Sequence, residues 1–400
     1  MRNAILLTLD TLRRDALGCY GGTQGQTPFL DSIQPHCIRF MQAYSGGPYT
    51  QAAFPGILTS SHYLDHGKSR QLSPKRQLIS EVMRQQGFET AAFHSNPYLS
   101  AFFGWNRGWD TFYDSMQDEV TDECPYIKSR VLNGKVRDWL AGRRDRSRPF
   151  FLWVHYMDVH EPYVPAPEYI ERVDPTLRIA PAEMMRLFRE VVLKRDVSDP
   201  DTIELLRKLY LAHVREVDDS ARELFGIFEE AGVLAESLVV VTSDHGEEFG
   251  EHGGLSHDGK MYDELVHVPL LIYEQSRSET LVAEHVVSTL DIAPTILHSL
   301  GLRPAPAFQG RPLLPLQNYA SDGAFGECYD KHGSTEKGAE KEVHYYRSER
   351  FKIIYRQRTE TWELYDLRSD PHERTNLADA SPEADRLKEK ILPRVGRQPR

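Results

Sequence analysis

The chain has 400 residues, 40% of them hydrophobic, and a formal net charge of −11 at pH 7. The acidic charge and the lack of basic clusters argue against a nucleic-acid partner, and no apolar run reaches the length of a membrane span. The four cysteines show no metal-type spacing, and we expect no disulfide framework in a chain this long. Because an apolar run follows residue 3 directly, leaving no room for a signal peptide, we expect a cytoplasmic protein.

Strand-like and helix-like stretches alternate along most of the chain, which predicts an α/β fold whose central sheet carries helices on both faces. In chain order, we expect a strand over 4–9, a short buried helix from residue 50, a helix over 78–86, strands over 90–93 and 150–154, a long helix over 201–231, strands over 237–242 and 267–273, and a helix over 291–300. The pattern changes near residue 304. Short strands over 343–347, 351–355 and 362–365 and a charged helix after residue 382 predict a smaller unit, so we expect domains at 1–310 and 311–400.

Two of the expected strands end in side chains that can bind a metal. Asp10 follows the first strand, and Asp244 and His245 follow the strand over 237–242. Open α/β sheets bind their ligands beyond the carboxyl ends of strands, so the pair predicts a metal site. An acid at a strand end is, taken alone, as readily a turn former or a helix cap.

Thr50 opens a short apolar helix. A hydroxyl at this position lies where unpaired backbone N–H groups favour an incoming anion. The alternative is that Thr50 only caps the helix.

Motifs spread over nearly the whole chain resemble the sulfatase family of the alkaline phosphatase superfamily, in the family's order. They are the segments 7–15, 18–21, 27–31, 243–247, 250–253, 262–264, 268–270, 290–295, 363–367, 370–371 and 376–377. The resemblance implies an alkaline-phosphatase-like, mostly parallel central sheet with helices on both faces, followed by a small C-terminal antiparallel sheet with one helix.

The resemblance also implies that one divalent cation is held by Asp10, Thr50, Asp244 and His245. Many sulfatases carry two successive acids after the first strand, whereas here Thr11 follows Asp10. With one carboxylate fewer and a histidine at position 245, the site favours Mn²⁺ or Zn²⁺, with Mg²⁺ and Ca²⁺ as alternatives.

The nucleophile position departs from the sulfatase pattern. Sulfatases place Cys or Ser there, in a Cys/Ser-x-Pro/Ala-x-Arg motif, and convert it to formylglycine, but this chain has Thr50 and, in place of the arginine, Phe54. Oxidation of threonine gives a ketone, so no aldehyde hydrate can form. A metal-activated threonine can instead attack phosphorus, as in the phosphodiesterases and phosphonate hydrolases that Thr50 resembles. We therefore predict a hydrolase of phosphate esters, diesters or phosphonates; the alternatives are a sulfatase, a phosphotransferase and an inactive binding relative.

Three further residues are candidates for contacting the transferred group. Asn96 follows the strand over 90–93 and could donate an amide hydrogen, although Asn before Pro97 is also a turn former. His160 and His257 match positions where relatives place a group that donates a hydrogen bond or protonates the leaving alcohol. As lone histidines both could equally be structural. His155 is a weaker candidate, since it could simply pack in the core.

Asp158, His160 and His257 raise the question of a second cation. Their spacing departs from the usual Asp-x-x-x-His pattern, so a single metal is favoured. We expect a small anionic ester as substrate, with no membrane or nucleic-acid partner. Specificity would come from insertions such as 102–118, whose aromatic residues either stack a ring or pack as an ordinary loop, and the homo-oligomeric state is open.

Overall fold

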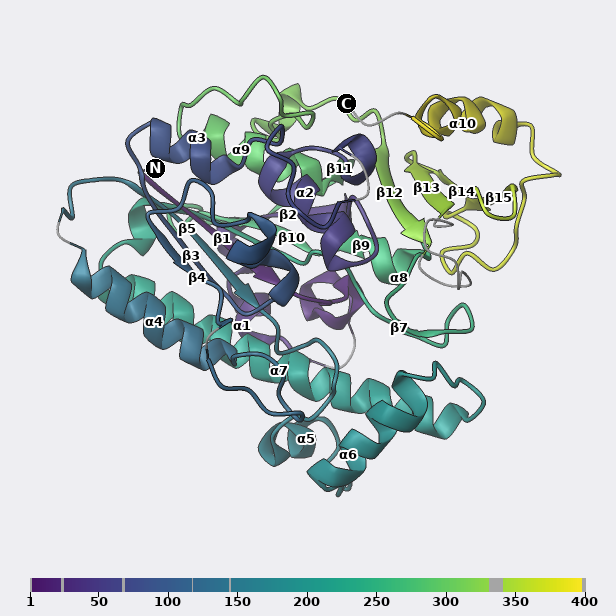
Figure 1. The fold of residues 1–400 in the computed structure, drawn as a ribbon, viewed down its shortest axis with the longest axis horizontal. Coiled ribbons are helices and arrows are strands. Elements are labelled where there is room, and N and C mark those ends of the chain that lie inside the picture. The colour runs from purple at the N-terminus through teal and green to yellow at the C-terminus, as the bar shows by residue number, and fades with distance from the viewer. Residues whose placement is uncertain are drawn as a thin grey trace.

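The computed structural model describes residues 2–22, 25–66, 69–116, 118–143, 145–330 and 341–397. Its centre is a nine-stranded sheet in the order β11-β2-β10-β6-β1-β5-β3-β4, with β9 paired to β2 (Figure 1). The strands are β1 (Asn3–Leu9), β2 (Cys37–Tyr44), β3 (Glu89–His94), β4 (Thr111–Tyr113), β5 (Phe150–Tyr156), β6 (Ser237–Thr242), β9 (His267–Val268), β10 (Leu270–Tyr273) and β11 (Leu281–Ser288). Only β9 and β10 run antiparallel to their neighbours, so the expected mostly parallel sheet is confirmed.

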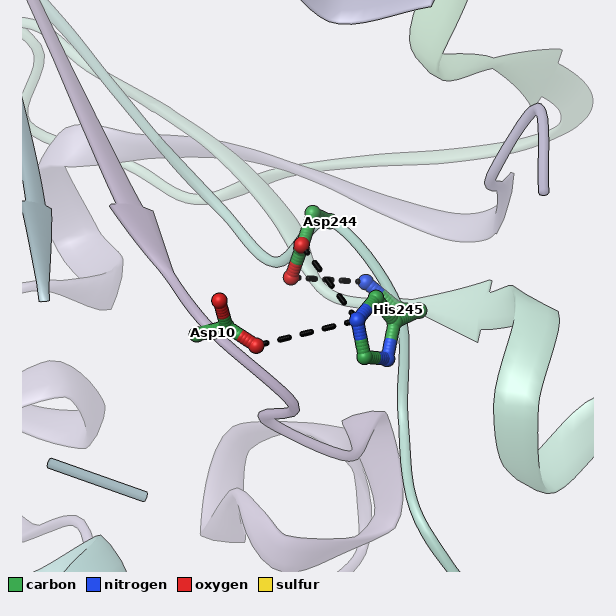
Figure 2. Close-up of side chains that lie close together, drawn as sticks. All are labelled: Asp10, Asp244 and His245. Atoms are coloured by element: carbon green, nitrogen blue, oxygen red, sulfur yellow. Dashed lines mark hydrogen bonds and ion pairs between the residues drawn. The ribbon is translucent and has the colours of Figure 1, made fainter. Parts of the chain in front are cut away.

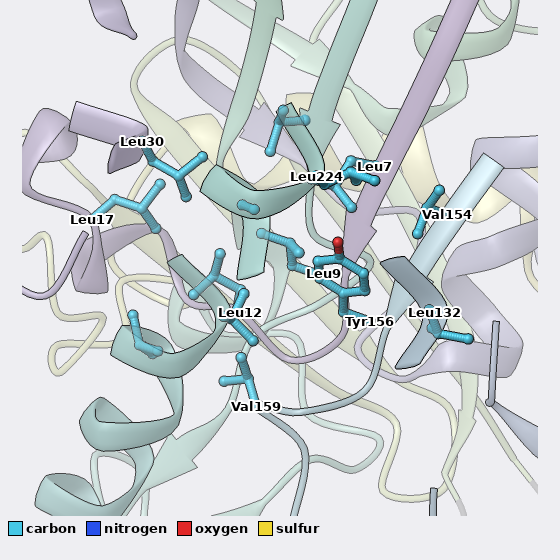
Figure 3. Close-up of a cluster of buried hydrophobic side chains, with 14 of the residues drawn as sticks. Leu7, Leu9, Leu12, Leu17, Leu30, Leu132, Val154, Tyr156, Val159 and Leu224 are labelled. Atoms are coloured by element: carbon cyan, nitrogen blue, oxygen red, sulfur yellow. The ribbon is translucent and has the colours of Figure 1, made fainter. Parts of the chain in front are cut away.

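Alternate residues of the central strands face two separate cores. In β1, Ile5, Leu7 and Leu9 join one buried cluster, whereas Ala4 and Leu6 join the other. This follows from the two-residue period of a strand. Figure 3 shows part of the first cluster, where Leu7 and Leu9 of β1 lie among side chains that include Leu132 and Leu224.

Helices cover both faces, as expected. α4 (Ser129–Gly142) and α7 (Pro200–Glu230) contribute to the first cluster, and α2 (Thr50–Thr59), α3 (Ile79–Gln85) and α9 (Ile292–Ser299) contribute to the second. Figure 1 shows these two groups on opposite sides of the sheet. The shorter helices are α1 (Pro28–Ser32), α5 (Pro167–Val173), α6 (Pro181–Leu187) and α8 (Asp263–Val266), and β7 (Glu248–Phe249) and β8 (Leu255–Ser256) pair with each other.

The C-terminal part forms the small antiparallel sheet that the sequence predicts. Its strands follow one another in the order β12 (Ala324–Asp330), β13 (Lys341–Arg347), β14 (Phe351–Arg356) and β15 (Thr361–Asp366). α10 (Glu383–Ile391) buries Leu387 and Ile391 against this sheet. The division into domains at residue 310 stays a prediction.

One expected strand needs correction. The single strand expected over 267–273 is two strands, because Pro269 has no N–H for the ladder and separates β9 from β10.

The four cysteines are free, as expected. Within the described ranges, no helix is both long and apolar enough to cross a membrane.

A buried cation joins the C-terminal sheet to the larger, N-terminal part of the chain. Lys352 on β14 is 0% exposed, and its Nζ lies 2.8 Å from Asp263 Oδ1 on α8 and 2.9 Å from Glu373 Oε1. A buried ammonium group without such partners would be strongly unfavourable. The two acids therefore fix how β14 packs against α8.

We expect Lys352→Ala to lower the free energy of unfolding by about 3–5 kcal/mol, because it leaves the buried Glu373 carboxylate, 2% exposed, without its cation. Lys388→Ala is the matched control: it also removes a lysine–aspartate pair, to an Asp385 whose side chain is 91% exposed, and should cost less than about 1 kcal/mol. Urea denaturation measures both variants. Equal losses would contradict a special role for Lys352.

Candidate active site

The site lies at the carboxyl ends of two neighbouring parallel strands. In the register of β1 and β6, Thr8 stands opposite Thr242, so the residues that follow both strands emerge at the same edge of the sheet. Figure 2 shows Asp10 leaving β1 toward Asp244 and His245 from the segment after β6. The side chains from which the sequence predicts a metal site therefore lie close together.

The backbone on both sides of this meeting point is unusual. Thr11, directly after Asp10, has φ 56°, a left-handed conformation that β-branched residues rarely adopt. Its N–H points to Asp244 Oδ1 at 3.4 Å. Gly246 packs so closely that a Cβ there would lie 2.0 Å from the Glu264 carbonyl oxygen. Only glycine allows the segment after β6 to lie this deep.

Asp10, Asp244 and His245 are fully buried, and one ligand atom from each lies within 4.8 Å of the others. His245 Nε2 is 3.6 Å from Asp10 Oδ1 and 3.4 Å from Asp244 Oδ2. Both of these carboxylate oxygens are buried and have no hydrogen-bond partner among the described residues. Buried oxygens of this kind need a partner, and a cation would supply it.

The tautomer of His245 fits the same conclusion. Its Nδ1 lies 2.9 Å from the Gly246 carbonyl oxygen, which can only accept, so the ring proton belongs on Nδ1. The lone pair of Nε2 then faces the two carboxylates. Without a cation these three groups repel one another; with one they form a donor set that a divalent metal prefers.

The pKa values of the three residues reflect their burial and the charges close to them. Burial and the nearby charge of Asp10 raise the pKa of Asp244 well above its ordinary value. For Asp10, burial opposes ionisation, but the hydrogen bond with His155 and the charge of His160 hold its pKa below the ordinary value. Burial and the charge of His257 lower the pKa of His245 to about 3, so this ring is neutral at pH 7, as a metal ligand must be.

His155 does more than pack. Its ring lies edge-on to Phe54, with centroids 5.0 Å apart, but its Nε2 is also 3.1 Å from Asp10 Oδ2 and its Nδ1 is 2.8 Å from Thr8 Oγ1. The histidine therefore holds Asp10 in place while Oδ1 stays directed toward His245. Support of this kind orients a metal ligand.

Thr50 is the first residue of α2, and its side chain reaches the cluster. Thr50 Oγ1 is 3.4 Å from His245 Nε2 and 3.4 Å from the Asn96 amide nitrogen. Asn96 Nδ2 also donates to Asp10 Oδ2 at 2.9 Å, and its Oδ1 accepts from the Tyr98 backbone N–H. Asn96 therefore forms the turn and contacts the cluster at the same time.

A cavity of about 330 Å³, here called the active-site cavity, opens beside Thr50. Asn96, His160 and His257 line it, as do Tyr126 and Arg195. The His160 and His257 rings are in contact, with centroids 5.0 Å apart. The structure thus brings every predicted site residue into one region: Asp10, Thr50, Asn96, His160, Asp244, His245 and His257.

Glu247 is the residue that sequence reasoning missed. It is fully buried, lies 3.0 Å from His257 Nδ1 and accepts a hydrogen bond of 2.7 Å from Tyr163. Burial raises its pKa to about 7. Its position in the sequence could have indicated a role, because Glu247 lies in the same segment as Asp244 and His245. Its contact with His257, however, is set by the fold.

Two other expectations are resolved by the geometry. The Asp158 carboxylate accepts hydrogen bonds from the Ser129 N–H (2.9 Å) and hydroxyl (3.0 Å) at the start of α4, so it does not converge with His160 and His257 on a second metal.

In the insertion 102–118, Trp105 and Trp109 are buried in the second core cluster. They are loop packing and do not line the active-site cavity.

Comparison with known proteins agrees with this architecture. The chain matches the sulfatase family over residues 2–302 and the C-terminal model of N-sulphoglucosamine sulphohydrolase over residues 250–397. It is 24% identical to an N-acetylglucosamine-6-O-sulfatase of Bacteroides thetaiotaomicron, over 97% of this chain and 84% of that protein.

Solved structures share the fold. A phosphonate monoester hydrolase of Agrobacterium radiobacter has a TM-score of 0.81 at 22% identity, covering 98% of this chain and 95% of that one. A second structure, BT4656 with its substrate D-glucosamine-2-N,6-O-disulfate, has a TM-score of 0.80 at 22% identity, covering 97% and 95%. Since the sulfatase model spans most of its length, the chain belongs to the sulfatase family, with an alkaline-phosphatase-like fold.

Proposed function

We propose that this protein is a metal-dependent hydrolase of phosphate esters, diesters or phosphonates, with Thr50 as its nucleophile. One observation carries the proposal: a threonine hydroxyl, which is a secondary alcohol, stands at the helix start, 3.4 Å from His245 Nε2 and beside the active-site cavity. A threonine cannot yield the aldehyde hydrate on which the sulfatase reaction depends. It can attack phosphorus directly.

The residues around Thr50 support a phosphoryl rather than a sulfuryl substrate. Phe54 occupies the position of the sulfatase arginine and is buried against Trp153, with ring centroids 5.5 Å apart. Ser95, at the position of the sulfatase lysine, donates to the Ile127 carbonyl oxygen. Both positions therefore lack the cationic side chain that sulfatases use there.

In the proposed reaction, Thr50 Oγ1 gives its proton to solvent water and forms a bond to phosphorus as the ester P–O bond breaks. The Asn96 amide lies close enough to Thr50 to donate to a phosphoryl oxygen, and His160 or His257 protonates the leaving alcohol. Water then attacks phosphorus, the Oγ1–P bond breaks, and Thr50 regains its proton. Asp10, Asp244 and His245 would hold a divalent cation, of the Mn²⁺ or Zn²⁺ type, which would lower the pKa of the hydroxyl and offset negative charge.

Glu247 would act through His257. Its carboxylate accepts from Nδ1, which fixes the ring orientation and stabilises the protonated imidazole. This arrangement makes His257 the better placed of the two histidines to donate a proton to the leaving group.

A sulfatase is the second candidate function, favoured by the family match and by the sulfatase relative of Bacteroides thetaiotaomicron. A phosphotransferase would differ only in passing the group to an alcohol instead of water. The buried cluster of three potential ligands argues against an inactive binding relative. A cytoplasmic location stays a prediction from the sequence, and the oligomeric state stays open.

We expect Asp10→Asn and Asp244→Asn to lose most of the bound cation and to lower turnover at least about a hundredfold, because each removes a negative ligand from a site with two carboxylates. Elemental analysis of folded protein measures the metal, alongside turnover of an aryl phosphate. Asp158→Asn is the control and should keep the metal content of the wild type. Full metal content in both site variants would refute the assignment.

Thr50→Ala should abolish turnover while the fold survives, since loss of one hydroxyl at a helix start costs about 1 kcal/mol. Thr50→Ser should keep partial activity. Thr59→Ala, in the last turn of the same helix, should leave kcat unchanged. If Thr50→Ala hydrolysed phosphodiesters at the wild-type rate, an activated water rather than Thr50 would be the nucleophile.

Phosphoryl esters should be preferred over sulfuryl esters with the same leaving group by about a hundredfold or more in kcat/KM, equivalent to about 2.7 kcal/mol of differential transition-state binding. The comparison uses p-nitrophenyl phosphate, bis-p-nitrophenyl phosphate, a p-nitrophenyl phosphonate and p-nitrophenyl sulfate. Mass spectrometry should find Thr50 unmodified, or phosphorylated after an acid quench. A higher kcat/KM for the sulfate would restore the sulfatase assignment.

A further inference from the structure

A second cavity, of about 340 Å³, lies at the junction between the catalytic part and the C-terminal sheet. We call it the junction cavity. The segment 13–15 and β2 line one side, and Arg347 at the end of β13 and the segment after β15 line the other. It shares no lining residue with the active-site cavity.

Every acid that lines the junction cavity is already paired with a cation. The pairs are Asp15 and Glu251 with Arg13 (2.7 Å each), Glu264 with His252 (2.6 Å) and Asp263 with Lys352 (2.8 Å). Each of these acids therefore has a basic side chain within ion-pair distance, although Asp15 and Glu251 share Arg13 and Lys352 also pairs with Glu373.

Three arginines that line the junction cavity differ from these acids, because they lack an ion-pair partner among the described residues. Within the described ranges, Arg14, Arg347 and Arg374 form no ion pair with a carboxylate. Arg347 is 4% exposed, and its guanidinium donates to neutral acceptors: the Tyr44 hydroxyl at 2.9 Å, the Gln42 side-chain oxygen at 3.2 Å and the Ser348 carbonyl. Asp263 is connected to Arg347 through the same Tyr44 hydroxyl.

Arg14 carries an unsatisfied donor. Its Nε is buried and, in the described part of the chain, has no hydrogen-bond partner. A buried guanidinium without a counter-ion is costly, and guanidinium groups bind phosphate and sulfate oxygens in paired hydrogen bonds. An anion between these arginines would satisfy both the charge and the donors.

Aromatic rings also line the junction cavity. Tyr44 stacks on His267 with centroids 4.5 Å apart, and the Arg347 guanidinium lies 5.4 Å from the Tyr44 ring centroid. The cavity is at the small end of the range for organic ligands, which is roughly 300–1,000 Å³. It therefore has room for a small molecule that carries the anionic group, as well as for the anion alone.

We propose that the junction cavity binds a phosphate or sulfate group, free or carried by a small organic molecule, through Arg14, Arg347 and Arg374. The proposal does not depend on the identity of the nucleophile, because the junction cavity lies apart from Thr50.

Isothermal titration calorimetry tests it with inorganic phosphate, inorganic sulfate and glucose 6-phosphate. The titrations use the full-length Asp244→Asn protein, so that binding at a complete metal site does not dominate. At least one of the three should bind with a stoichiometry of one. Adding Arg14→Gln or Arg347→Met should weaken that binding at least tenfold, whereas Arg368→Gln, an exposed arginine of the same region outside the cavity, should leave it unchanged.

The three titrations also identify the source of the anion. Tighter binding of glucose 6-phosphate than of inorganic phosphate indicates an organic ligand, and equal binding indicates a free anion. Arg14 is partly exposed, so Arg14→Gln reports on the site even where Arg347→Met does not fold. Absence of binding in all three titrations, or equal binding by the arginine variants and the parent, would overturn the proposal.

Discussion

The close approach of two buried carboxylates governs this structure. Asp10 and Asp244 are both fully buried at the ends of adjacent strands, and each directs an oxygen with no hydrogen-bond partner among the described residues toward His245 Nε2. Like charges at this separation repel strongly in a low-dielectric interior. A divalent cation would offset this repulsion, so the two carboxylates have the arrangement expected of a metal site.

The surrounding residues hold this cluster from several independent elements. His155 on β5 fixes Asp10, Asn96 after β3 reaches both Asp10 and Thr50, and Glu247 orients His257. Because β1, β5 and β6 are neighbours in one sheet, small shifts of these side chains are opposed by the packed core on both faces. The rigidity of the sheet thus supports the precision that catalysis needs.

The chain belongs to the sulfatase family, yet two of its residues depart from the sulfatase pattern. Thr50 stands where sulfatases place Cys or Ser, and Phe54 stands where they place an arginine. One scaffold can present different nucleophiles, since a helix N-terminus stabilises negative charge whichever residue begins the helix. These two departures are the reason that we propose phosphoryl rather than sulfuryl transfer.

The sequence by itself determined the elements whose patterns are local. The apolar runs of β1 and β6, the long α7 and the position of Thr50 at a helix start were all predictable, and with them the metal-ligand candidates, because an acid after a buried strand lies at the sheet edge. β2 and β11 were not predicted: their sequences mix buried and exposed residues, and their pairing joins distant segments.

Only the tertiary structure decided the rest. The contact of His155 with Asp10, the pairing of Glu247 with His257 and the position of Arg14 and Arg347 in the lining of one cavity all depend on residues from different elements. No periodicity encodes such contacts. They depend on how the strands and the C-terminal sheet pack, which is set by the burial of the whole chain rather than by any one segment.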